Sequence, residues 1–135
     1  MPFRSLLVVL LVSAALAGCS TVTFVAQRYD GDPRPASSIA IFRITPRDQA
    51  HVSSIDGEKV DVQLAEDSRM HIELLPGVHD VGMYVPTGAV SVAHHARFQA
   101  LAGKVYRAEL TGEQARVLEI DPGSGSVLGE ASVAR

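Results

Sequence analysis

Five histidines are the side chains of this sequence best suited to binding a metal ion or moving a proton: His51, His71, His79, His94 and His95. No two of them have the H-x-x-x-H spacing of a helical metal site. Neighbours on a strand point to opposite faces, so His94 and His95 do not chelate one ion together. We expect His71 on the polar side of its strand, and His79 at the core margin, bonded to nearby backbone. The alternative is a metal or small-molecule carrier that uses His79 with His94 or His95.

Other polar clusters lack the spacing of catalytic or cofactor motifs. Asp56, Glu58 and Asp61 surround one predicted hairpin, where a solvated face is expected. Asp30-Gly31-Asp32 has no distant glutamate to complete a calcium loop. The glycines and serines of 123–129 match neither the dinucleotide fingerprint nor the nucleophile elbow. We therefore predict no catalytic residues, no metal site and no cofactor, and a protein that is not an enzyme.

Cys19 is the only cysteine, and it follows a leader with the three parts of an export signal. Arg4 gives a positive start, Leu6–Leu16 form an apolar run, and Ala17 and Gly18 are small. The run has about 11 residues, whereas a spanning helix needs roughly 20, so a transmembrane anchor is not favoured. An exported protein with one cysteine forms no internal disulfide, so Cys19 needs another use.

The sequence Leu16-Ala17-Gly18-Cys19 resembles the lipobox of bacterial lipoproteins. That resemblance implies that residues 1–18 are a cleaved signal peptide and that Cys19 carries a diacylglyceryl thioether and an N-acyl chain. Two or three acyl chains hold a protein stably on a membrane. Ser20, in place of the aspartate that retains lipoproteins in the inner membrane, implies an outer-membrane location facing the periplasm. The alternative is an ordinary signal peptide with Cys19 beside the cut by chance.

Composition narrows the class of protein further. Removing residues 1–18 leaves 117 of the 135 residues, which is enough for one domain. The formal net charge of −3 becomes −4, because Arg4 leaves with the leader and no acid does. A mildly acidic chain with no basic run and no tryptophan is not typical of nucleic-acid binding.

Residues 19–37 are predicted to be the lipidated N-terminus and a flexible tether, because Tyr29–Pro35 is rich in turn-forming residues. An alternative is that Val22, Phe24 and Ala26, which alternate with other residues, dock as an edge strand. The domain itself is predicted to cover residues 38–135.

Within 38–135 apolar and polar residues alternate repeatedly, which indicates strands with one buried face. The runs are 39–44, 59–64, 70–74, 81–85, 96–100 and 106–110. Turn residues separate them, among them Gly57, Pro76, Gly77 and Gly103. We expect positive φ at Gly57 and Gly77, and a hydrogen-bond partner for the Tyr106 hydroxyl. The pattern predicts an all-β fold, an antiparallel sandwich of seven or eight strands.

Four segments together resemble the small sandwich domains of bacterial envelope lipoproteins of unknown function: Ile55-Asp56-Gly57, Leu75-Pro76-Gly77-Val78-His79-Asp80-Val81, Ala102-Gly103-Lys104-Val105-Tyr106 and Ile120-Asp121-Pro122-Gly123. They are also similar to PEGA-type domains and, more loosely, to transthyretin-like sandwiches, although the Pro-Glu-Gly-Ala tetrapeptide is absent. The resemblance implies a fold and no activity. We predict a lipid-anchored cell-envelope protein with a structural or adaptor role, which binds another envelope protein through a strand edge or loop.

Overall fold

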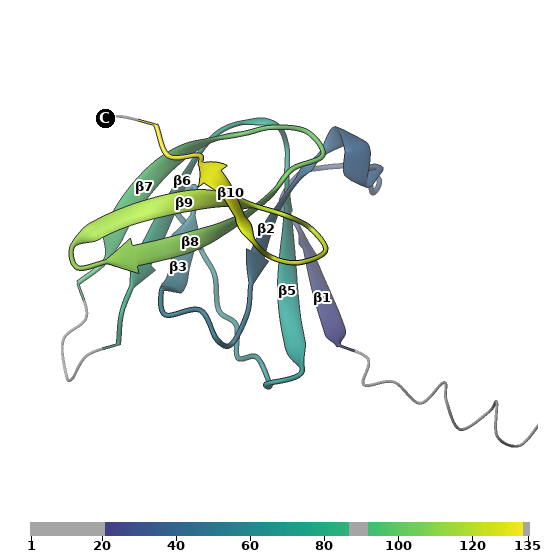
Figure 1. Cartoon of the computed structure of the whole chain (residues 1–135). Helices are drawn as coiled ribbons and strands as arrows, with labels where there is room; N and C mark the ends of the chain where they lie inside the picture. Colours follow the sequence, from purple (N-terminus) through teal and green to yellow (C-terminus); the bar gives the residue numbers. More distant parts are fainter. Residues whose placement is uncertain (1–20, 87–91, 134–135) are drawn as a thin grey trace, which may run out of the picture.

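The computed structural model describes residues 21–86 and 92–133, and strands dominate them (Figure 1). Apart from a 3-10 turn at Ala36–Ser38, the regular elements there are ten strands. They are β1 (Val22–Gln27), β2 (Ala40–Ile44), β3 (His51–Ile55), β4 (Glu58–Lys59), β5 (Ser68–Leu74), β6 (Gly77–Tyr84), β7 (His94–Ala100), β8 (Val105–Thr111), β9 (Gln114–Ile120) and β10 (Val127–Glu130). The prediction of an all-β fold is confirmed.

The strands form two sheets, a six-stranded one in the order β1-β5-β2-β8-β9-β10 and a four-stranded one in the order β4-β3-β6-β7. The prediction of purely antiparallel pairing is wrong, because β1 runs parallel to β5 and β2 runs parallel to β8. After β2 the chain crosses to the other sheet and returns later. Strands distant in sequence thereby become neighbours, and no tight hairpin forces them to run in opposite directions.

The predicted strand at 59–64 is mostly not a strand. Only Glu58–Lys59 pairs, with β3. Val60 is nevertheless 8% exposed, and Val62 packs against the core. Their alternation therefore reflects packing of an irregular segment rather than a hydrogen-bonded ladder.

The core lies between the two sheets. Phe98 of β7 stacks its ring against Phe42 of β2 and Tyr106 of β8, with ring centroids 5.8 and 5.1 Å apart. All three are fully or almost fully buried, and burying such a side chain contributes about 1.5–3 kcal/mol. Among the apolar positions of the predicted runs from residue 70 onward, Met70 and Val85 are only half-buried. The others are confirmed as buried: Ile72, Leu74, Val81, Met83, Ala96, Phe98, Ala100, Tyr106, Ala108 and Leu110.

The turn between β3 and β4 is a two-residue loop in which Asp56 and Gly57 both have positive φ, +52° and +78°. This is the backbone of a type I′ hairpin turn, which twists in the same sense as the strands. Gly77, just after Pro76, has φ +139°, and Gly103 has φ +79°.

Residues Val22–Gln27, which lie in the predicted tether, form the edge strand β1, so the interpretation of this stretch as flexible coil is wrong and the alternative holds. β1 pairs with β5 from Val22↔Ser68 to Gln27↔Glu73. Beyond its end, Arg28 forms an ion pair with Glu58 and donates a hydrogen bond to the Lys59 carbonyl at 3.1 Å. These contacts join the edge of one sheet to the edge of the other.

Candidate functional site

His79 has a structural environment. Its Nδ1 lies 2.6 Å from Asp56 Oδ2, and its Nε2 lies 2.7 Å from the Leu75 carbonyl oxygen. Its ring packs on Phe98, with centroids 5.9 Å apart. The prediction of a core-margin histidine bonded to backbone is confirmed. Both ring nitrogens are occupied by protein groups, so neither faces an open ligand position.

The structure does not bring His79 together with His94 or His95. In the β6–β7 ladder His79 pairs with Phe98, while His94 pairs with Met83. Phe98 and His94 are four positions apart on β7, so His79 and His94 lie about 13 Å apart along the sheet. His95 Nδ1 instead lies 2.8 Å from Asp80 Oδ1. Within residues 21–86 and 92–133, no group of three or more His, Cys, Asp or Glu could hold a metal ion.

The other predicted polar clusters serve turns and ion pairs. Glu58 pairs with Arg28, while Asp61 is exposed. The Gly31 carbonyl accepts a hydrogen bond from the Gln27 side chain at 2.8 Å. In the loop after β9, Asp121 Oδ2 accepts hydrogen bonds from the backbone of Ser124 and its hydroxyl, at 2.7 and 3.0 Å. These bonds hold the pKa of Asp121 below its usual value.

Cys19 and Ser20, the predicted lipidation and sorting residues, lie outside the described residues. Among the residues that are described, no helix has the length and apolar character needed to cross a membrane.

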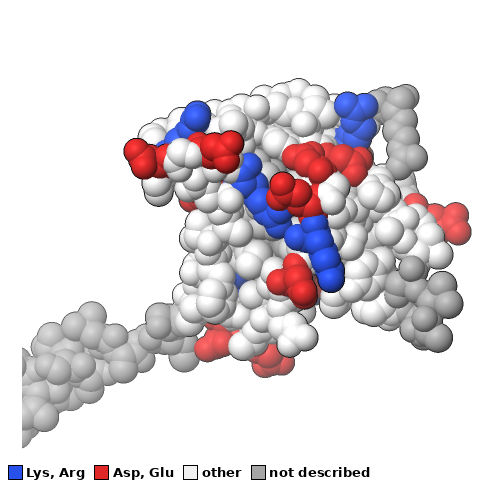
Figure 2. Space-filling model, turned by 180° about the vertical axis from the view of Figure 1, so that it is seen from behind, with Lys and Arg blue, Asp and Glu red and all other residues white. Residues whose placement is uncertain are grey.

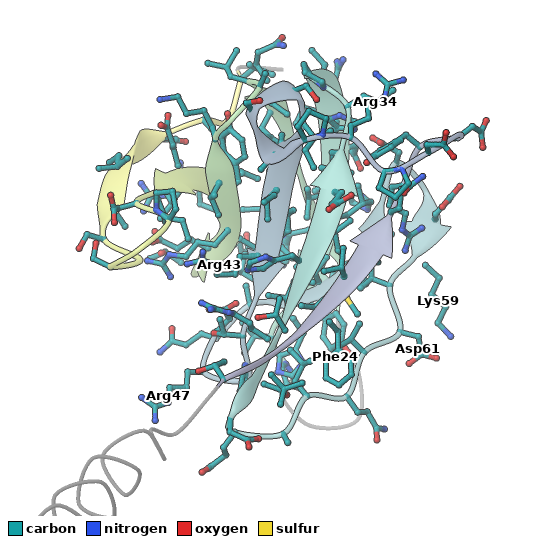
Figure 3. All side chains as sticks on the ribbon, turned by 90° about the vertical axis from the view of Figure 1, so that its right-hand side faces the viewer. Phe24, Arg34, Arg43, Arg47, Lys59 and Asp61 are labelled. Carbon is teal, nitrogen blue, oxygen red and sulfur yellow. The ribbon has the colours of Figure 1, made fainter. Side chains whose placement is uncertain are left out.

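A hollow of about 450 Å³ lies on the outer face of the six-stranded sheet. We call it the arginine pocket, because three arginines from three neighbouring strands line it: Arg43 of β2, Arg69 of β5 and Arg107 of β8. The remaining lining residues are Thr45, Asp48, Ile120 and Gly123–Gly125. In Figure 3 the labelled Arg43 lies beside β2, on the side of the green and yellow strands.

Strand register brings these arginines together. Arg43 pairs with His71 in the antiparallel β2–β5 ladder. The parallel β2–β8 ladder runs from Ile41↔Val105 to Phe42↔Tyr106, and Arg43 and Arg107 are the residues that follow its end. Both then line the same hollow.

Arg43 is held rigidly at the base of the pocket. It is only 8% exposed, its Nε donates to His71 Nε2 at 3.3 Å, and its Nη2 donates to the Pro122 carbonyl at 2.9 Å. Burial, and next the charge of Arg69, lower the pKa of Arg43. Burial, and next the charges of Arg43 and Arg69, lower the pKa of His71 to about 4. At neutral pH His71 is therefore uncharged and able to accept the bond from Arg43.

The arginines of the pocket form no direct ion pair with a described residue, although the charges of Asp121 and Asp48 raise the pKa of Arg43 in part. Arg69 Nε donates to the Thr23 hydroxyl at 3.1 Å, and Arg107 Nε is buried without any hydrogen-bond partner among the described residues. The nearby carboxylate of Asp48 accepts hydrogen bonds from Thr45 instead.

Some basic side chains elsewhere are paired with acids, and others are not. Arg116 forms ion pairs with Glu109 and Glu130, and Lys104 pairs with Glu119 at 3.6 Å. No ion pair with a described residue is formed by Arg34, Arg47 or Arg97. Figure 2, the view from behind Figure 1, shows acidic and basic side chains interspersed over that face. The arginine pocket is therefore distinguished by three arginines that share one hollow, rather than by the lack of ion pairs.

A second hollow, of about 480 Å³, lies where β2 ends and β3 begins. Aliphatic side chains such as Ile44, Val60 and Val62 contribute to its lining, and both charged residues there, Asp48 and Asp61, are acidic. His51 stacks on Tyr84 at its margin, with ring centroids 5.6 Å apart. It offers no group that singles out a ligand.

Sequence reasoning missed the arginine pocket because its residues are far apart in the chain and form no basic run. One signal was present. Arg43 interrupts the β-branched run 39–44, and such a run with one charged residue is unusual unless that residue faces a polar site.

Comparison with known proteins gives no relative from which a role for these residues could be carried over. No family model, no curated protein and no solved structure matches this chain.

Proposed function

We propose that this chain is a lipid-anchored protein of the bacterial cell envelope, held through Cys19 at the outer membrane and facing the periplasm, with an adaptor rather than a catalytic role. The lipobox-like sequence before Cys19 supports the anchor. We further propose that the two sheets are those of a sandwich related to envelope lipoprotein domains. The packing of Phe98 against Phe42 and Tyr106 across the core supports that proposal.

The observation that carries the adaptor role is the open edge of β1. Val22, Phe24 and Val25 are 48, 51 and 61% exposed. The Val22 N–H donates to the Asp67 carbonyl just before β5, and the Arg28 N–H donates to the Glu73 carbonyl of β5. By alternation, the outward N–H and C=O groups of β1 are those of Thr23, Val25 and Gln27. A row of unpaired backbone groups beside apolar side chains is a template for an added strand.

Other edges of the two sheets are less open. β4 has only two residues, and β10 has four with a register shift before Gly129. The edge of β7 is covered in part, because Val133 donates to the Arg97 carbonyl at 2.8 Å and Ser132 bridges to Phe98. We therefore assign the partner, an extended segment of another envelope protein, to β1.

Site-specific photo-crosslinking in intact cells tests the adaptor role. A photoreactive residue at position 25 should give a discrete crosslinked product, whereas one at Val127, which is 50% exposed on β10, should not. In a second arm the photoreactive residue replaces Thr23. There Val25→Pro removes one outward N–H and should abolish the crosslinked product, whereas the matched control Val25→Thr should retain it. Equal crosslinking from positions 25 and 127 would contradict strand addition at β1.

The anchor has its own test. Mass spectrometry of the mature protein should find an N-terminal Cys19 carrying acyl groups, and Cys19→Ala should move the protein out of the membrane fraction while its melting temperature stays unchanged. A mature N-terminus at another residue, or an unmodified thiol on Cys19, would remove the basis for the proposed location.

A further inference from the structure

The arginine pocket has the properties of an anion-binding site. Three guanidinium groups from adjacent strands share one hollow, and the only acidic side chain that lines it, Asp48, is engaged by Thr45. Burial and the like charge of Arg69 each disfavour the charged form of Arg43 more than the nearby carboxylate of Asp121 or of Asp48 favours it. Folded proteins retain such local conflicts mainly at functional sites.

The chemistry of the pocket selects among anions. A guanidinium group presents a planar fork of donors that fits two oxygens of a carboxylate or phosphate. One carboxylate offers two oxygens and one charge, which a single arginine satisfies. Three arginines from three strands that line one hollow fit an anion with three or more free oxygens and up to two charges, which describes inorganic phosphate or a phosphate monoester.

The position of the pocket indicates where such a phosphate resides. Arg69 bonds to Thr23, the second residue of β1, and Thr23 is four residues after Cys19. Four extended residues span at most about 14 Å. If Cys19 is lipidated, as proposed above, the anchor keeps this end of the domain within reach of the lipid headgroups. The hollow of about 450 Å³ also leaves room for atoms attached to the phosphate.

We propose that the arginine pocket binds a phosphate monoester carried as the headgroup of a membrane lipid, with Arg43, Arg69 and Arg107 contacting its oxygens. His71 is a positioning residue, which accepts the Arg43 Nε–H and fixes the direction of that guanidinium. The buried Nε–H of Arg107, which has no partner among the described residues, gains one in the complex. The location of the phosphate on a lipid rests on the proposed anchor, whereas the phosphate chemistry does not.

The test uses the full processed protein, purified from membranes in a nonionic detergent. Its arginine Nε–H signals are followed by NMR at constant ionic strength. One arm adds inorganic phosphate, a second adds phosphatidic acid to the micelles, and a third adds diacylglycerol, which is the same lipid without the phosphate. We expect the Arg43 and Arg107 signals to shift in the first two arms and not in the third, and at lower concentration with the lipid.

Matched variants separate the site from general charge effects. Arg107→Gln and Arg69→Gln should weaken binding by at least about tenfold, since each removes a charge-assisted pair of hydrogen bonds. Arg97→Gln makes the same change of charge on the exposed face of β7 and should alter binding by less than about twofold. Arg107→Gln should also leave the melting temperature of the unliganded protein unchanged or raised, because Arg107 forms no ion pair with a described residue and its buried Nε–H has no partner there.

Each outcome decides one point. Shifts with inorganic phosphate at the same concentration as with the lipid would support a phosphate site and overturn the lipid headgroup as its source. No shift in either arm, or equal weakening in Arg97→Gln and Arg107→Gln, would overturn the site itself. If Arg107→Gln does not fold, Arg107→Lys keeps the charge, loses the planar fork and should still weaken binding. Loss of the lipid anchor in the mass spectrum, with binding of inorganic phosphate intact, would refute the anchor alone.

Discussion

Lowering the pH from 7 to 5 is expected to destabilise this protein through His71. The ring lies on β5 between Arg43 of β2 and Val25 of β1, with Arg69 two residues away on its own strand. Burial and the two arginine charges lower the pKa of His71 from 6.5 to about 4 in the folded state. The unfolded chain has no such environment, so there His71 takes up a proton near pH 6.5.

The sign and size of the effect follow from proton linkage. Between pH 6.5 and 4 the unfolded state binds the proton and the folded state does not, so stability falls as the pH falls. The contribution is fully present above pH 6.5 and is lost by the time the pH reaches the folded pKa of about 4. From pH 7 to pH 5 the loss is about 2 kcal/mol at most, and about 1 kcal/mol once screening of a partly exposed ring is allowed for.

Urea unfolding of the wild type and of His71→Gln, followed by circular dichroism at pH 7 and pH 5 without phosphate, measures this difference. The other histidines make the same contribution to the pH dependence of stability in both proteins, so that contribution cancels in the comparison. The glutamine amide keeps a hydrogen-bond acceptor for Arg43. The wild type should lose about 1–2 kcal/mol more than the variant, which corresponds to about 4–10 °C in melting temperature. Equal losses in the two proteins would refute the reasoning.

Two further stability predictions follow from single backbone positions. Gly77→Val should destabilise by about 1–3 kcal/mol in urea unfolding, because a φ of +139° is strained for a β-branched residue, whereas Gly129→Val on the exposed β10 should change stability by less than about 0.5 kcal/mol. Tyr106→Phe should cost about 0.5–1.5 kcal/mol in the same assay, because the 2.9 Å hydrogen bond from the Leu101 N–H is lost. Tyr84→Phe, whose hydroxyl bonds to no described residue, is its control, and an equal cost in both would show that the Leu101 bond contributes nothing.

Local sequence patterns predicted the parts of the fold that depend only on residues close together in the chain. Alternation placed Met83, Phe98 and Ala108 on the core face, because successive strand side chains point to opposite sides. The Asp56-Gly57 pair marked its hairpin because few residues other than these types adopt positive φ there. The same alternation failed at Val60 and Val62, where burial comes from packing without a strand partner.

Strand order and the arginine pocket depend on pairings that no local pattern contains. Alternation predicts which face of its strand Arg43 occupies, but not that β8 is the next strand. The neighbour relation between Arg43 and Arg107 exists only because β2 and β8 run in the same direction in one register. A cluster built from register between distant strands is therefore invisible to motif searches, whatever its charge.

The parallel pairings also govern how this chain reaches its fold. β2 lies at the middle of its sheet, and one of its two neighbours, β8, joins it through contacts such as Ile41 with Val105, which are 64 residues apart. β1 likewise pairs with β5, and the paired residues Val22 and Ser68 are 46 residues apart in the sequence. Loops of this length must close before the contacts between these strands can form. The entropy that the chain loses in closing them slows folding to the millisecond-to-second range typical of non-local β proteins. During synthesis β5 becomes available to β1 and β2 once residue 74 has been added, whereas β8 becomes available to β2 only from residue 105 onward, so the centre of the six-stranded sheet is completed late.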